Sequence, residues 1–111
     1  MGKPTDLVQG TLDLLILKAL SLEPMNGWAV AKRIVQISND VLQVQQGSLY
    51  PALQRMLKQG WVKADWGVSA TNRRVRIYRI TPAGVKHLQG EIASFERMLE
   101  GIVLVLAPAK L

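Results

Sequence analysis

The stretch GSLYPALQRMLKQGWVKADW, residues 47–66, has the pattern of a helix that leads directly into a β-strand. Apolar side chains recur at helical spacing in its first part: Leu49, Leu53, Met56 and Leu57. Pro51 falls in the first turn, where a missing N–H is tolerated, and Gly60 stands where a left-handed residue ends such a helix. Residues 61–66 alternate apolar and polar side chains. We therefore expect a helix over residues 47–59 and a strand after it.

The sequence after this stretch completes a hairpin and begins a long helix. Residues 74–80 alternate as a second strand, although the apolar side switches halfway, which predicts a bulge or burial on both faces. The polar residues 67–73 would form the hairpin tip. Thr81 is a good N-cap and Pro82 is in the favoured first helical position, so the last helix is expected to begin there.

The sequence before residue 47 predicts a turn, a helix and a weak strand. Residues 23–27 combine Pro, Asn and Gly, as turns do. Asn26 then caps a helix over residues 27–38. The apolar face of this helix is Val30, Ile34 and Ile37. Residues 41–45 alternate weakly and are interpreted as a short strand.

The first and last helices carry more apolar surface than one small domain needs. The first, residues 11–22 with Thr11 as its cap, is apolar on nearly all sides and must be covered from two sides, which a 111-residue monomer can hardly achieve. The last helix has an a/d heptad seam: Leu88, Ile92, Phe95, Leu99, Ile102 and Leu106. We expect a homodimer whose interface adds three residues of the first helix to this seam: Leu12, Leu15 and Ile16. Alternatively, the seam covers only the domain's own core.

Three helices followed by a two-stranded hairpin form a winged helix-turn-helix, so the expected fold class is mainly α with a small β-hairpin (α+β). The winged helix-turn-helix DNA-binding domain would span residues 1–81, and a long C-terminal dimerisation helix residues 82–111. In this architecture the third helix enters the major groove of DNA.

The positive charge of the chain is concentrated in one segment. The 111 residues carry 14 Lys and Arg against 8 Asp and Glu, a net charge of +6. Residues 55–86 hold eight of these cations and a single carboxylate, Asp65. Such a block across the third helix and the hairpin indicates a docking face for a polyanion, although a solvated charged surface is the alternative.

The outward side of the third helix and the hairpin tip carry the candidate DNA contacts. Gln54 is suited to adenine and Arg55 to guanine or phosphate, while Ser48 lies at a helix N-terminus, a natural phosphate site. An arginine at the hairpin tip would enter the minor groove, although Arg74 and Arg76 would also shield a sheet edge. The residues expected to bind DNA on these grounds are Ser48, Pro51, Gln54, Arg55, Lys58, Asn72, Arg73, Arg74 and Arg76. Lys32, in the second helix, is a further candidate for a phosphate contact.

The residue types needed for catalysis or metal binding are scarce. Cys is absent and His87 is the single His, which disfavours a thiol nucleophile, a His-dependent triad and a zinc site. We expect no enzyme activity, no cofactor and no metal, and we interpret His87 as a surface or packing residue. Trp61 and Trp66 are interpreted as core or wing packing, whereas Trp28 is the candidate to line a ligand cavity between subunits.

The chain shows no pattern of a signal peptide or a membrane span. The richest apolar run, residues 12–22, is about half as long as the roughly 20 residues that a span needs. The last helix is also unsuited to an anionic membrane surface because its polar side carries carboxylates: Glu91, Glu96 and Glu100. We therefore expect a cytoplasmic protein without a membrane partner.

Five segments of the sequence resemble the PadR family of transcriptional regulators. They are residues 27–34 (GWAVAKRI), 47–53 (GSLYPAL), 60–62 (GWV), 72–74 (NRR) and 78–84 (YRITPAG). The resemblance runs from about Leu7 to Ile102 and implies a homodimeric winged-helix repressor. The recognition-helix Tyr and Pro of the family match Tyr50 and Pro51, which adds Tyr50 to the expected DNA contacts, and its basic wing matches residues 72–76.

The sequence departs from the family pattern in three places. Trp28 replaces the usual Tyr, Lys58-Gln59 replaces the usual acidic pair, and a single C-terminal helix resembles the short subfamily. Some short members bind aromatic or cationic drugs in a pore between subunits, so an inducer of unidentified chemistry is an open expectation.

These features together predict a sequence-specific DNA-binding transcriptional regulator. The resemblance implies a repressor, and a two-fold dimer would read the half-sites of a palindromic operator about one DNA turn apart. The alternative is a winged-helix protein-interaction module whose basic face binds an acidic partner protein.

Overall fold

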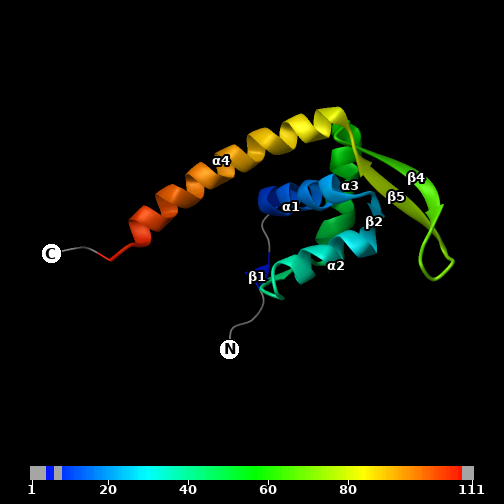
Figure 1. Cartoon of the computed structure of the whole chain (residues 1–111), viewed down its shortest axis with the longest axis horizontal. Helices are drawn as coiled ribbons and strands as arrows, with labels where there is room; N and C mark the ends of the chain where they lie inside the picture. The colour runs from blue at the N-terminus through cyan, green and yellow to red at the C-terminus, as the bar shows by residue number, and fades with distance from the viewer. Residues whose placement is uncertain (1–4, 7–8, 109–111) are drawn as a thin grey trace.

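The computed structural model describes residues 5–6 and 9–108. Its elements in chain order are β1 (Thr5–Asp6), α1 (Gln9–Leu22), β2 (Met25–Asn26), α2 (Gly27–Ile37), β3 (Leu42–Gln43), α3 (Gln46–Gln59), β4 (Val62–Val68), β5 (Arg74–Ile80) and α4 (Pro82–Leu106). Three helices and the sheet gather at one end, and α4 extends away from them (Figure 1), so that the molecule measures 61 × 35 × 21 Å. The expected α+β winged-helix fold with a long C-terminal helix is confirmed.

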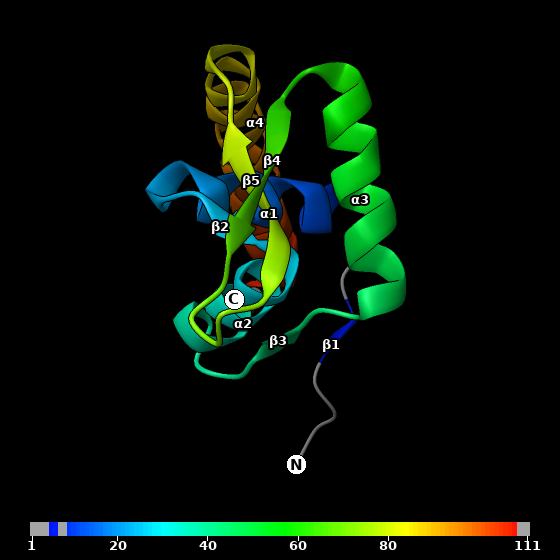
Figure 2. The same ribbon diagram turned by 90° about the vertical axis from the view of Figure 1, so that its right-hand side faces the viewer.

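The wing, formed by β4, β5 and the loop between them, belongs to a three-stranded antiparallel sheet in the order β2-β5-β4 (Figure 2). β4 and β5 pair without interruption over all seven residues of each strand, so of the two predicted explanations for the switch, a bulge or burial on both faces, the bulge is excluded. The apolar side switches because both faces are partly covered: Tyr78 is buried on one face and Ile77 is half-buried on the other. Met25 and Asn26, predicted to lie in a turn, instead form β2 and pair with β5.

α1 runs through the middle of the core (Figure 1). Helices α2, α3 and α4 and strand β5 all pack against it. As a result, six of its apolar side chains are each at most 8% exposed within the single chain: Leu12, Leu14, Ile16, Leu17, Ala19 and Leu20. The prediction that one chain cannot cover this helix is therefore wrong, and Leu12 and Ile16 have no apolar surface left for a second copy. α1 also begins at Gln9, so Thr11 lies inside it and is not its cap.

α2 starts as predicted and ends with an exposed side chain. The Oδ1 of Asn26 accepts a hydrogen bond from the Ala29 N–H at 2.8 Å, which makes Asn26 the N-cap. Val30 and Ile34 are buried, but Ile37 is 62% exposed and does not belong to the apolar face. The short strand predicted after α2 is β3, which pairs in parallel with β1.

α3 begins one residue earlier than predicted. Pro51 is therefore its sixth residue, beyond the first turn, and leaves the carbonyl of the exposed Gly47 without its helical donor. The apolar side of the helix is anchored in the core by four side chains that are at most 1% exposed: Leu49, Ala52, Leu53 and Met56. Gly60 ends the helix with a left-handed φ of 78°, as predicted.

The junction between the wing and α4 is tightly packed. The rings of Trp61 and His87 stack with their centroids 3.6 Å apart and an interplanar angle of 11°. A Cβ on Gly84 would collide with the backbone carbonyl of Trp61. The Thr81 hydroxyl donates to the Gly60 carbonyl at 2.6 Å and accepts from the Gly84 N–H at 3.0 Å, so Thr81 caps α4 as predicted. These contacts fix the start of α4 to the base of the wing.

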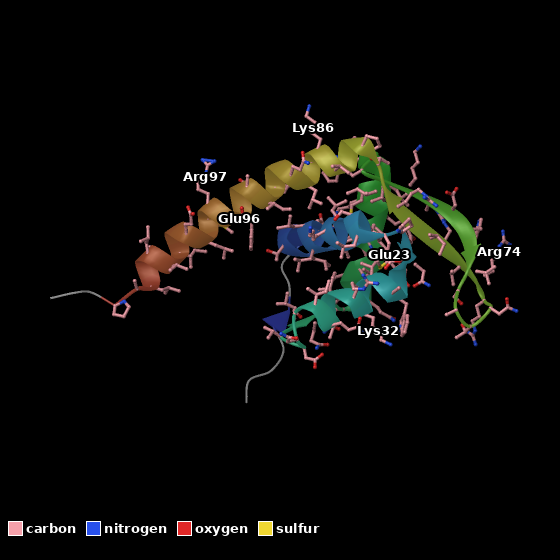
Figure 3. All side chains as sticks on the ribbon, in the orientation of Figure 1. Glu23, Lys32, Arg74, Lys86, Glu96 and Arg97 are labelled. Atoms are coloured by element: carbon pink, nitrogen blue, oxygen red, sulfur yellow. The ribbon has the colours of Figure 1, made fainter. Side chains whose placement is uncertain are left out.

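The two halves of α4 have different surroundings. In the first half Leu88 is buried in the core, and Ile92 and Phe95 pack against that core. The second half leaves the domain, and no other element of the described chain lies beside it (Figure 3). The rest of the predicted seam is therefore exposed: Leu99 by 43%, Ile102 by 43% and Leu106 by 75%.

Candidate nucleic-acid interface

α3 presents a polar side to solvent because its apolar side is held in the core. The outward residues are exposed along the whole helix: Gly47, Ser48, Tyr50, Pro51, Gln54 and Lys58. All of them except Gly47 are among the predicted DNA contacts. Lys58 follows Gly47 by eleven residues, about 16 Å along the helix axis, so this face is about three turns of helix long.

Arg55 is the exception on this face. Its Nη2 lies 2.8 Å from Oδ1 of Asp13 in α1, and its Nε is buried without a hydrogen-bond partner. An arginine paired with a carboxylate of its own chain would have to break that ion pair to reach a base or a phosphate. The predicted outward direction of Arg55 is therefore wrong, because the side chain ties α3 to α1.

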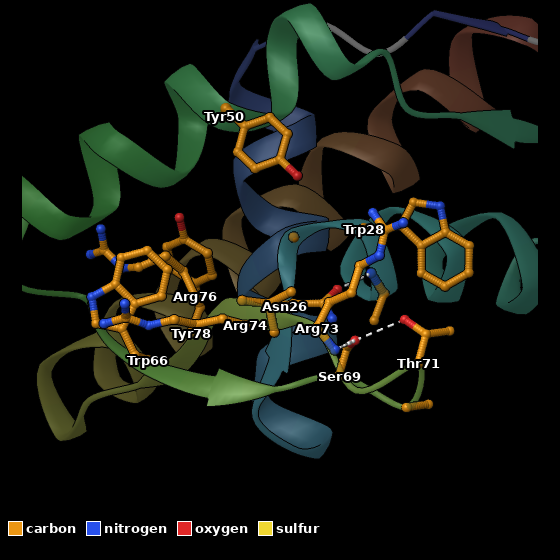
Figure 4. Close-up of a pocket in the computed structure, with 14 residues that line it drawn as sticks. Asn26, Trp28, Tyr50, Trp66, Ser69, Thr71, Arg73, Arg74, Arg76 and Tyr78 are labelled. Atoms are coloured by element: carbon orange, nitrogen blue, oxygen red, sulfur yellow. Dashed lines mark hydrogen bonds between the residues drawn. The ribbon is translucent and has the colours of Figure 1, made fainter.

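A cleft of about 840 Å³ lies between the start of α2, the first half of α3 and the wing (Figure 4). Its lining is rich in aromatic and cationic side chains: Trp28, Tyr50, Trp66, Arg73, Arg74, Arg76 and Tyr78. The Tyr50 ring packs on the first residue of α2, where a Cβ added to Gly27 would lie 2.8 Å from its Cε1. The absence of a side chain at Gly27 therefore permits α2 and α3 to approach each other at the cleft.

The arginines that line the cleft are not paired with carboxylates. Within residues 5–6 and 9–108, no carboxylate lies within 4.0 Å of the guanidinium groups of Arg73, Arg74 or Arg76. Arg79, on the opposite face of the sheet, has its Nε 3.9 Å from Oδ2 of Asp65. Figure 3 shows Arg74 projecting from the wing. Three arginines without a carboxylate partner are therefore on the cleft side of the wing, whereas the opposite face carries Lys63, and Arg79 beside Asp65.

The tip of the wing is shorter than the predicted residues 67–73. Residues 69–73 connect the strands, and the Ser69 N–H donates to the Arg73 carbonyl at 2.8 Å. Asn72 adopts a left-handed φ of 63°, a conformation that Asn tolerates better than most residues do. This geometry fixes the backbone of Arg73 next to the cleft.

Two exposed tryptophans flank the cleft. Trp28, the candidate for a ligand cavity, is 59% exposed, and Lys32 Nζ lies 4.7 Å from its ring centre. Trp66 is also 59% exposed, so core packing is excluded, and its ring packs within the wing against Arg74 and Arg76. Sequence reasoning missed Trp66 as part of this surface. The strand register would have revealed it, because that register places Trp66 opposite Arg76.

The predicted DNA contacts fall into two groups around this surface. Four of them line the cleft: Tyr50, Arg73, Arg74 and Arg76. Six others are exposed outside it: Lys32, Ser48, Pro51, Gln54, Lys58 and Asn72. The candidate interface is therefore wider than the cleft, with the outward side of α3 and the wing as its two projecting parts.

The part of the chain that the structure describes contains neither a candidate metal site nor a candidate membrane span. No group of three or more His, Cys, Asp or Glu side chains is placed to hold a metal ion there. Nor does any described helix combine the length and apolar character needed to cross a membrane.

The family model of the transcriptional regulator PadR-like family matches residues 16–90, from within α1 to the first third of α4. The chain belongs to this family. The match includes α3, the wing and the cleft. Because the family consists of transcriptional regulators that bind DNA, this PadR-like chain is a DNA-binding transcriptional regulator.

Solved structures of PadR-like and other transcriptional regulators share the fold. A transcriptional regulator from Clostridium thermocellum is 28% identical with a TM-score of 0.80, over 88% of this chain and 95% of that chain. A PadR family regulator from Eggerthella lenta is 26% identical with a TM-score of 0.73, over 90% and 85% of the two chains. A PadR-like regulator from Bacillus cereus, 23% identical over 90% and 95%, has a TM-score of 0.75 and shows the fold alone.

Proposed function

We propose that this PadR-like regulator is a homodimeric repressor that binds a palindromic operator. The observation that carries the proposal is the exposure of polar α3 residues and unpaired wing arginines around one cleft. A duplex seated there would meet hydrogen-bonding groups in its major groove and cations along its backbone.

The residues of the interface have different proposed roles. Gln54 reads a base edge from α3, because its amide both donates to and accepts from adenine. Arg73, Arg74 and Arg76 neutralise phosphates from the wing, or enter the adjacent minor groove. The other proposed contacts approach the sugar-phosphate backbone: Lys32, Ser48, Tyr50, Pro51, Lys58 and Asn72. Arg55 is left out because of its pair with Asp13.

The homodimer is proposed from the exposed half of α4. A two-fold axis beside Leu99, Ile102 and Leu106 would cover these side chains with the same residues of a second copy. We retain the predicted division into a DNA-binding part, residues 1–81, and a dimerisation part, residues 82–111, whose helix ends at Leu106; residues 1–4, 7–8 and 109–111 lie outside the described residues. Leu15, which is half-buried, is the one residue of α1 from the predicted interface that keeps exposed surface.

A small-molecule inducer and a cytoplasmic location stay predictions of the sequence. Trp28 is the only candidate that the sequence offered for an inducer site. Its exposed ring borders the same cleft as the wing arginines, so a ligand that covers it would compete with DNA for this surface.

The first experiment selects duplexes from a random pool with the purified protein. We expect a palindrome with half-sites about 10 base pairs apart. The affinity for the selected site should fall with salt, with a log–log slope of about −0.9 for each phosphate that is neutralised. If the protein ignores duplexes at low salt but binds an acidic polypeptide, the alternative of a protein-interaction module replaces the proposal.

Two pairs of variants then test whether the cleft side of the wing and the outward side of α3 bind DNA. Arg73→Ala should weaken binding to all duplexes, whereas Arg79→Ala on the opposite sheet face should change it little. Gln54→Ala should cost roughly 1–3 kcal/mol on the selected site only, and Gln89→Ala on the exposed side of α4 is its control. An Arg79→Ala variant that binds as weakly as Arg73→Ala would show that the proposed face is misplaced.

The direction of regulation needs a separate measurement. With the selected operator placed at a promoter, transcription by purified RNA polymerase should decrease as the protein is added. The Gln54→Ala variant should leave transcription unchanged at the same concentration. An increase in transcription would make the protein an activator and would leave the DNA-binding proposal intact.

A further inference from the structure

The face of the wing that borders the cleft carries alternating cations and aromatic rings. Trp66 in β4 is directly opposite Arg76 in β5. The Cζ atoms of Arg74 and Arg76 lie 4.3 and 5.6 Å from the centre of the Trp66 ring, and Arg76 Cζ is also 6.0 Å from the centre of the Tyr78 ring. Figure 4 shows these side chains together on the wing.

The position of Trp66 is not explained by packing in the core. Along the same side of β4 the exposure rises from the buried Val62 through the half-buried Ala64 to Trp66 at 59%. The base of the wing thus supplies the apolar burial, and the large indole lies farther out, where it contacts the two arginines. The role of Trp66 therefore depends on its effect on the side chains of those two arginines.

An aromatic face and a carboxylate hold a guanidinium group in different ways. A carboxylate neutralises the charge and uses N–H donors of the group. An indole attracts the cation through its ring electrons, leaves the charge in place, and leaves the five in-plane N–H donors free. The two modes occur on opposite faces of this sheet: Arg79 is beside Asp65, whereas Arg74 and Arg76 are beside Trp66.

We propose that Trp66 is a positioning residue for DNA binding. Its ring restrains the guanidinium groups of Arg74 and Arg76 on the side of the cleft, with their charge and their N–H donors available to two phosphates of the duplex. Because the ring already restrains the two arginine side chains in the free protein, they lose less conformational entropy when they contact the phosphates. This inference rests on the proposed contact between the wing and DNA.

The test compares Trp66→Phe, which keeps a ring, with Trp66→Leu, which keeps an apolar side chain without one. Binding to the selected operator is measured by fluorescence anisotropy over a range of salt concentrations, alongside thermal unfolding of each variant. Trp66→Leu should weaken binding by about fivefold to tenfold, and Trp66→Phe by about threefold or less. Trp66→Leu should also reduce the magnitude of the salt slope by about 0.9 to 1.8, the equivalent of one or two phosphates.

A double-mutant cycle separates positioning from direct contact. In the Arg74→Ala/Arg76→Ala background, Trp66→Leu should weaken binding by less than about twofold, because no guanidinium remains for the ring to hold. Full additivity with an unchanged salt slope would overturn the proposal, since the indole would then contact DNA itself. Equal binding by Trp66→Leu and the unmodified protein would overturn it as well.

The failure of the proposed function has a different signature. If the unmodified protein does not bind duplexes at low salt, DNA binding through this face is wrong and the positioning role falls with it. If it binds but Arg74→Ala/Arg76→Ala binds equally well, these two arginines do not contact DNA, and Trp66 has no contact to position. The role of Trp66 alone is refuted when the unmodified protein binds duplexes, Arg74→Ala/Arg76→Ala weakens that binding, and Trp66→Leu does not.

Discussion

α1 and the second half of α4 are both strongly apolar, yet they have opposite surroundings. α1 is enclosed by three helices and a strand of its own chain, and most of its apolar side chains are at most 8% exposed. The second half of α4 projects beyond the domain (Figure 1). Seven of its apolar side chains are between 43 and 83% exposed: Met98, Leu99, Ile102, Val103, Leu104, Val105 and Leu106.

This difference shows that apolar composition indicates the need for burial but not the chain that provides it. The contribution of α1 is to the stability of one subunit, because removing its side chains would leave cavities in that subunit. The end of α4 contributes little to that stability while it is exposed, and an exposed apolar surface of this kind is typical of an interaction site. Mutations in the two helices should therefore separate folding from assembly.

The largest effect is expected for Ile16→Ala in α1. Ile16 is 0% exposed, and truncation of such a side chain costs about 2–5 kcal/mol of unfolding free energy. Urea denaturation followed by circular dichroism measures the loss. Ile37→Ala, at a 62% exposed position of α2, is the matched control and should change the unfolding free energy by about 0.5 kcal/mol or less. Equal losses would show that the core does not centre on α1.

A smaller effect, on assembly alone, is expected for Ile102→Asp in α4. If a second copy covers the seam, the substitution removes the favourable burial of one isoleucine side chain and places a charge in the interface. The free energy of dimerisation should then become less favourable by at least about 2 kcal/mol. This loss corresponds to a dimer dissociation constant that is roughly 30-fold higher. Sedimentation equilibrium measures the dissociation constant, with Ile37→Asp on the exposed side of α2 as control. A dimer of unchanged affinity would mean that the seam lies outside the interface.

The local signals of the sequence were sufficient to predict most of the fold. Asn26, Gly60 and Thr81 occupy the predicted helix ends, because caps depend on the residue itself and its near neighbours. β2 was missed because two residues carry no periodicity, and only pairing with β5 makes them a strand. The burial of α1 within one chain was not predicted because it depends on how α2, α3, α4 and β5 pack around it, which local sequence signals do not specify.

The candidate site was predictable where exposure follows from helix geometry. The outward residues of α3 other than Arg55 and Tyr50 are exposed as the spacing predicts, and Tyr50, which the family resemblance added, is exposed as well. Arg55 was misplaced because its partner, Asp13, lies 42 residues away in another helix. The role of Trp66 was missed because it depends on a cross-strand register, which a single strand's alternation does not fix.

A third prediction tests whether the enclosure of α1 also depends on its ion pair with α3. Asp13→Asn keeps the shape of the side chain but removes the charge that faces Arg55, and should cost about 1 kcal/mol of unfolding free energy because both groups are partly shielded from water. Glu23→Gln is the control, since the side chains of its pair with Arg33 are 57 and 34% exposed. It should cost a few tenths of a kcal/mol at most. The opposite ranking in urea denaturation would contradict a role for Asp13 in holding the two helices together.

The smallest effect is expected for Leu104→Ser, which asks how much of the end of α4 is covered in the proposed dimer. Leu104 is 77% exposed and lies on the side of α4 opposite the seam. A two-helix contact through the seam would leave it in water, so both the unfolding free energy and the dimer dissociation constant should change by about 0.5 kcal/mol or less. A loss in dimer affinity as large as that of Ile102→Asp would mean that the partner encloses the end of α4 from several sides, as the rest of the chain encloses α1. The two apolar helices would then differ only in which subunit covers them.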